Sequence, residues 1–84
     1  MDLRAEGMLR AFAEATKKGS LTAEDRRLLY QLAIFVHQHA LKISGLMVRF
    51  RLIAVGLPQE RAERYGVEFD NYGELLALYD RQRL

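Results

Sequence analysis

The chain has no cysteine and no tryptophan, and it has a single proline among 84 residues. Without cysteine, no disulfide can stabilise it, and a reducing compartment is the expected setting. A domain of this size buries only about two thirds of its unfolded surface, so its core alone provides a small margin of stability. Association with another chain is the remaining general way to bury more apolar surface.

Segments that would place the chain in a membrane or export it are also lacking. The N-terminus has no apolar stretch of the kind that a signal peptide requires. The most apolar part of the chain is interrupted by Lys42, Arg49 and Arg51, so it contains no run of about 20 uncharged apolar residues. We therefore expect a cytoplasmic protein with no membrane span.

A strong charge of one sign is missing as well, since the net charge is only +2. Counting side chains, residues 1–20 carry +1, residues 21–56 carry +3 and residues 57–84 carry −2. A dedicated nucleic-acid-binding domain usually has a far more basic surface. The composition therefore allows nucleic acid as a partner but does not favour it.

What the chain does contain is one long apolar stretch in its middle. Thr22 precedes two acidic residues and is a good N-cap, whereas Gly56 followed by Leu-Pro is a strong helix stop. In residues 28–57, 20 of 30 side chains are apolar or aromatic. The polar residues follow one stripe that stays in phase across Gly45, which predicts a single helix over residues 22–55, continuous or bent at that glycine.

Shorter helical patterns lie on either side. Residues 2–18 form an amphipathic pattern, and residues 58–65 and 71–82 predict two short helices separated by Gly66. No strand pattern of sufficient length occurs. We expect an all-α domain over residues 1–84, with two long and two short helices organised on the mostly buried central helix.

The central helix predicts self-association. It would extend about 50 Å, whereas a globule of 84 residues is about 30 Å across. Much of its apolar surface forms a broad face that includes Leu28, Leu32, Val36, Ile43, Leu46, Met47, Phe50 and Ile53. A second, narrow seam recurs every seven residues and comprises Ile34, Leu41, Val48 and Val55. We predict a helical homodimer or higher oligomer through this seam; the alternative is a bent helix inside a monomeric bundle.

Candidate chemical groups are sparse. His37 and His39 are two residues apart and point about 200° away from each other on a helix, so they cannot chelate one metal ion. Ser44 lies about 10 Å along the axis from His37, so the two share no hydrogen bond within one chain. The sequence therefore predicts no metal, no cofactor and no catalytic residue. An enzyme with a site between subunits, formed by His37, Ser44 and Arg51, is the lowest-ranked alternative.

Two features relate to nucleic acid. Residues 62–67 resemble the middle of a helix-turn-helix motif, with an alanine, a glycine four residues later and then an apolar residue. That resemblance implies DNA binding, but Glu68, Asp70 and Glu74 would make the recognition helix acidic, which disfavours contact with DNA. The second feature is a sparse stripe of basic residues that can contact an anion or a nucleic acid. It comprises Arg27, Lys42 and Arg49, with Arg51 on the adjoining line.

Taken together, these patterns predict a small non-enzymatic protein that acts by protein–protein interaction. We expect an assembly, adaptor or regulatory protein of a bacterial or phage system, with itself and another protein as partners. The alternative is a regulator that binds nucleic acid through the basic stripe or the helix-turn-helix-like end.

Overall fold

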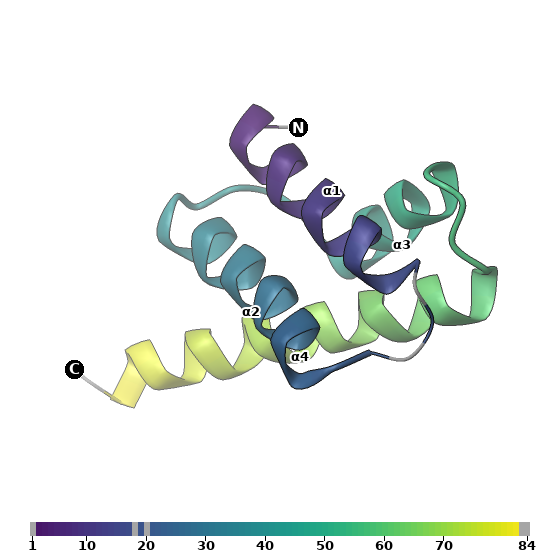
Figure 1. Ribbon diagram of the computed structural model, residues 1–84. Coiled ribbons are helices and arrows are strands. Elements are labelled where there is room, and N and C mark those ends of the chain that lie inside the picture. The colour runs from purple at the N-terminus through teal and green to yellow at the C-terminus, as the bar shows by residue number, and fades with distance from the viewer. Residues whose placement is uncertain (1, 18, 20, 83–84) are drawn as a thin grey trace.

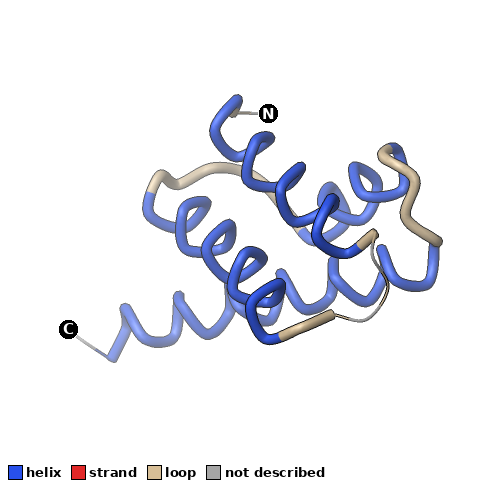
Figure 2. The backbone as a smooth tube through the Cα atoms, in the orientation of Figure 1, coloured by secondary structure: helices blue, strands red, loops and turns tan. Residues whose placement is uncertain are grey.

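The computed structural model describes residues 2–17, 19 and 21–82, and within these residues it contains helices and no strands (Figure 2). This confirms the prediction of an all-α fold with four helices. No helix in the described part of the chain is long and apolar enough to cross a membrane. The helices are α1 (Leu3–Thr16), α2 (Ala23–Gln38), α3 (Gly45–Ala54) and α4 (Gln59–Gln82).

The longest helix, α4, forms the base on which two of the other helices pack. Both α2 and α3 pack on α4, and α1 packs mainly on α2 and also touches α3 (Figure 1). The C-terminal end of α4 extends beyond α2, as the yellow end of the ribbon shows. The molecule is consequently elongated, with extents of 41 × 25 × 19 Å and a radius of gyration of 12.4 Å.

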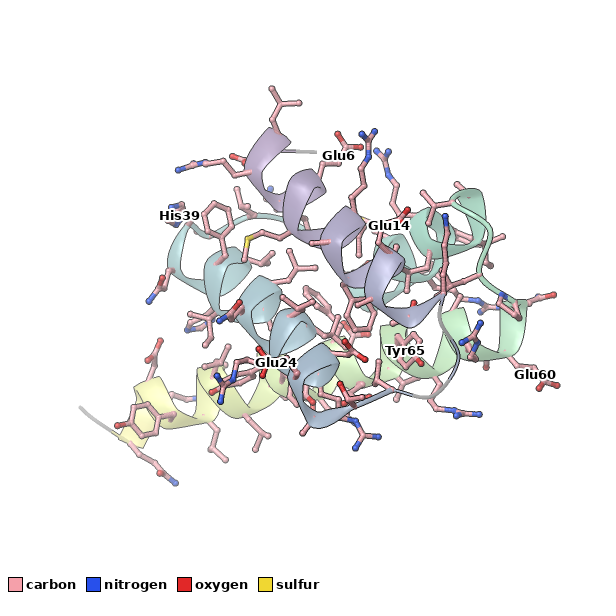
Figure 3. All side chains as sticks on the ribbon, viewed as in Figure 1. Glu6, Glu14, Glu24, His39, Glu60 and Tyr65 are labelled. Atoms are coloured by element: carbon pink, nitrogen blue, oxygen red, sulfur yellow. The ribbon has the colours of Figure 1, made fainter. Side chains whose placement is uncertain are left out.

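All four helices contribute to the core. Its largest fully buried apolar side chains include Phe12 of α1, Leu29 of α2 and Leu52 of α3. The ring of Phe12 meets the ring of Tyr65 edge to face, with centroids 5.1 Å apart. Tyr65 projects from α4 toward α1 (Figure 3), so this aromatic pair joins helices that are far apart in sequence.

The N-terminal helices form as their capping residues predict. Asp2 caps α1, and Thr22 with Asp25 forms a capping box at the start of α2. The guanidinium of Arg4 lies 4.9 Å from the ring centroid of Phe35, which brings the start of α1 to the end of α2. The predicted antiparallel packing of these helices is therefore present, although α1 ends at Thr16 and the predicted end at Lys18 lies outside the described residues.

The prediction of one helix over residues 22–55 is wrong, because the chain leaves the helix at residues 39–44. Ala40 adopts φ 51°, a left-handed conformation that is normally taken by glycine. The N–H of Leu41 donates to the carbonyl of Val36 over 3.0 Å, so the end of α2 closes on itself as a Schellman motif. α2 and α3 then pack separately on α4.

A new helix starts immediately after the break. The side chain of Ser44 accepts a hydrogen bond from the N–H of Met47 over 3.3 Å and caps α3. The predicted stop at Gly56 is confirmed: it has φ 104°, and a second closing hydrogen bond joins the N–H of Leu57 to the carbonyl of Leu52 over 3.1 Å.

The prediction of two short helices over residues 58–65 and 71–82 is also wrong, since α4 is continuous. Gly66 is helical and buried, and it does not end a helix. A Cβ atom at Gly66 would lie 2.5 Å from the carbonyl oxygen of Gly45, so the glycine permits the backbones of α3 and α4 to meet. There is no turn at residues 62–67, and the helix-turn-helix resemblance therefore does not extend to the structure.

Candidate interaction surface

An apolar surface is exposed on α3, and the C-terminal part of α4 exposes another at Leu75, Leu78 and Tyr79. The inner side of α3 buries Gly45, Val48 and Leu52 against the bundle. Its outer side exposes Leu46 by 56%, Phe50 by 58%, Met47 by 38% and Ile53 by 36%. These four residues, which we call the α3 face, recur at helical spacing and therefore lie on one side of the helix.

Two arginines border the α3 face on opposite sides. Arg51 donates to the carboxylate of Glu6 of α1 over 2.7 Å. Arg49 approaches Glu63 of α4 at 3.9 Å, which is longer than a hydrogen bond, and its guanidinium lies 5.9 Å from the ring centroid of Phe50. The α3 helix itself contains no acidic residue, so the rim contributed by α3 is basic.

The apolar surface continues onto α4 at Val67, which is 56% exposed. Val67 lines a shallow pocket together with Leu46, where α3 crosses α4. The α3 face was not predicted as a solvent-exposed surface. The apolar periodicity that marks it was present in the sequence, but it was assigned to the broad buried face of a longer helix.

The predicted seam is not a continuous surface in this chain. Val48 has no exposed surface and belongs to the core, whereas Val55 is exposed beyond the end of α3. Ile34 is on α2, and Leu41 lies in the connection between α2 and α3, where it packs on the core. The break at residues 39–44 separates the four residues, because their seven-residue spacing aligns them only on an unbroken helix.

The predicted basic stripe is dispersed for the same reason. Arg27 is exposed on α2, and Lys42 is exposed in the connection after it. Arg49 and Arg51 leave α3 on different sides, toward Glu63 and Glu6. The structure therefore does not bring the four basic residues into one surface for an anion.

His37 and Ser44 are also separated by their contacts. The Nε2 of His37 lies 2.5 Å from the Oδ2 of Asp80, which joins the end of α2 to the C-terminal part of α4. His39 stacks against the ring of Phe35 at the outer end of α2 (Figure 3). Ser44 caps α3, as described above. Within residues 2–17, 19 and 21–82, no three histidine or acidic side chains are grouped in a way that could hold a metal ion.

A polar cluster secures α2 to the middle of α4. The rings of Tyr30 and Tyr72 meet edge to face at 5.2 Å, and the Tyr72 hydroxyl donates to Glu68 over 2.6 Å. Burial, and then the hydrogen bond to the Glu68 carboxylate, raise the pKa of Tyr72 to about 12. Tyr72 therefore keeps its proton between pH 10 and about 12, where an ordinary tyrosine loses it.

Next to this cluster, a groove separates the end of α2 from α4. Its volume is about 680 Å³, and its walls include Val36 and His37 of α2, Ile43 of the connection, and Gly73 and Glu74 of α4. We call this the α2–α4 groove. It is the largest open hollow described on the molecule, and it lies next to the N-terminal end of α3.

Comparison with known proteins gives no further guide to this surface. No protein-family profile, curated protein or solved structure matches the chain.

Proposed function

We propose that the protein is a small non-enzymatic assembly or regulatory protein that acts by binding protein, in the first place further copies of itself, through the α3 face. The observation that supports this proposal is the contrast within α3, where a helix of ten residues exposes four large apolar side chains. Contiguous exposed apolar surface on a soluble domain is typical of a binding site.

The expected affinity follows from the exposed fractions. Burying a large apolar side chain completely contributes about 1.5–3 kcal/mol, so burying the exposed halves of these four contributes roughly 3–6 kcal/mol. Association also costs rotational and translational freedom, and a dissociation constant of 1 μM needs about 8 kcal/mol in total. We therefore expect weak, concentration-dependent association, at or above the micromolar range.

A charged side chain in the α3 face tests the proposal. Phe50→Glu is expected to abolish self-association in sedimentation-velocity measurements, because a carboxylate would have to lose its water at the interface. Leu3→Glu is the matched control, since Leu3 is 83% exposed on α1 and lies outside the α3 face. Equal association of the wild type and of the Phe50→Glu variant would contradict the role of the α3 face.

A further inference from the structure

The α2–α4 groove is an open hollow that no described part of its own chain fills. Three small residues, Ala33, Gly73 and Ala77, leave the groove open. Val36 and Phe69 contribute apolar side chains to its lining. A Cβ atom at Gly73 would have no neighbour within 4 Å. This glycine costs α4 roughly 1 kcal/mol relative to alanine, and no atom of its own chain requires the missing side chain.

A comparison within α4 indicates what such a glycine accommodates. Gly66 and Gly73 are seven residues apart and lie on nearly the same side of the helix. Gly66 is covered by α3 of the same chain, with the α3 backbone in direct contact. Asp70, between the two glycines, accepts a hydrogen bond from the N–H of Gly45 over 2.7 Å and also lines the groove. The groove therefore continues the line along which α4 already receives a helix.

We infer that the α2–α4 groove binds the α3 face of a second copy of this chain, with Phe50 as the anchoring side chain. The inference rests on the proposed function, because it names the surface that the α3 face binds. The α3 face is apolar and exposed, and the groove is an open hollow with apolar side chains in its lining. Helix-in-groove binding uses apolar side chains at a spacing of three and four residues, as Leu46, Phe50 and Ile53 have.

Charge also distinguishes this pairing from the pairing of two α3 faces. Asp70 and Glu74 are exposed and acidic at the groove, and Glu74 has no ion-pair partner among the described residues; His37 is the basic group there. The helix that would enter the groove carries only basic charges, and Arg51 is half exposed. Two α3 faces would instead meet with Arg49 and Arg51 on both sides, each beside a glutamate of its own chain, and would leave Glu74 of the groove without a basic partner.

This contact joins two different surfaces. Two chains can make it reciprocally, with each α3 face in the groove of the other, which closes a two-fold dimer, or make it once in a head-to-tail arrangement. A head-to-tail contact leaves one α3 face and one groove free on every pair, and it continues until a ring closes or a filament grows. The wild type is therefore expected to associate as its concentration rises, to a dimer where the exchange is reciprocal and beyond the dimer where it is head-to-tail.

Mixing two variants tests the inference. Phe50→Glu removes the α3 face but leaves the groove, and Gly73→Gln fills the groove but leaves the α3 face. Each variant alone is expected to be monomeric by light scattering, whereas an equimolar mixture forms a complex of twice the chain mass and no larger. Gly7→Gln is the control, because Gly7 is also helical with no neighbour within 4 Å of a Cβ, and it lies on α1 away from the groove.

The outcomes separate this inference from the proposed function. If the wild type associates but the mixture remains monomeric, or if Gly73→Gln associates as the wild type does, the groove is not the binding surface and the proposed function stands. If the wild type is monomeric at every concentration, both are wrong. Glu74→Arg is a second groove variant, which reverses a charge at the groove and does not replace a glycine of the helix. It is expected to weaken association at least several-fold.

Discussion

Replacing Gly66 with alanine is expected to separate α3 from α4. The new Cβ would lie 2.5 Å from the carbonyl oxygen of Gly45 and 3.3 Å from the Cβ of Arg49. The first neighbour is backbone and cannot rotate away, so the two helices must move apart by about 1 Å, and overpacking of this kind costs about 1–3 kcal/mol or more. Alanine gains about 1 kcal/mol in helix propensity, and the expected net loss of stability is therefore up to about 2 kcal/mol or more.

Gly73→Ala is the matched control in the same helix. It gains the same propensity and meets no neighbour within 4 Å, so the free energy of unfolding should rise by about 0.5–1 kcal/mol. Urea unfolding followed by circular dichroism measures the free energy of unfolding of both variants. In thermal unfolding of a domain of this size, a difference of 1 kcal/mol corresponds to roughly 4–8 °C in Tm. If Gly66→Ala is as stable as Gly73→Ala, the close approach of α3 to α4 is not as described.

Three further perturbations test the contacts that hold the helices together. Asp70→Ala removes the carboxylate that accepts from the N–H of Gly45, and it should cost about 1–2 kcal/mol in urea unfolding, as the loss of a helix cap does. Arg61→Ala removes hydrogen bonds of 2.9 and 3.0 Å to the carbonyls of Thr16, the last residue of α1, and of Gly19, and it should lower stability by about 1–3 kcal/mol. Tyr72→Phe should remove a pH dependence. Because the Tyr72 pKa is raised from 10.0 to about 12, the folded state alone keeps the proton between these values, so wild-type stability falls as pH rises through that window and the variant lacks this fall.

Each of these three has an outcome that contradicts it. Arg64→Ala is the control for Arg61→Ala, because Arg64 is exposed on the same helix. Equal stability of the two variants would mean that the hydrogen bonds from Arg61 to the end of α1 do not stabilise the fold. Unchanged unfolding of Asp70→Ala would mean that Asp70 does not cap α3. For Tyr72, parallel stability curves of wild type and variant between pH 9 and 12 would contradict the raised pKa.

The ends of helices that use common capping residues were predictable from the sequence. Thr22 marks the start of α2 because its hydroxyl caps the helix, and Gly56 marks the end of α3 because a residue without a side chain accepts a positive φ. Ala40 was missed because an alanine with positive φ costs energy that only the folded context offsets. Gly66 was misread because its role depends on a helix that packs against it, which no local pattern reveals.

The exposure of the α3 face was also not predictable from a local sequence pattern. The periodicity of Leu46, Phe50 and Ile53 correctly groups them on one side of a helix, but periodicity does not say which side faces the core. Once the chain breaks at residues 39–44, α3 is free to turn relative to α2. The side containing Val48 then became buried, and the side expected in the core became exposed.

The mass of the wild type in solution, measured by light scattering over roughly 1 μM to 1 mM, tests self-association most directly. We predict that the mass rises with concentration from the 9.7 kDa of one chain to that of two chains or more. A mass that stays at 9.7 kDa over the whole range would contradict the proposal that the α3 face binds further copies of the protein.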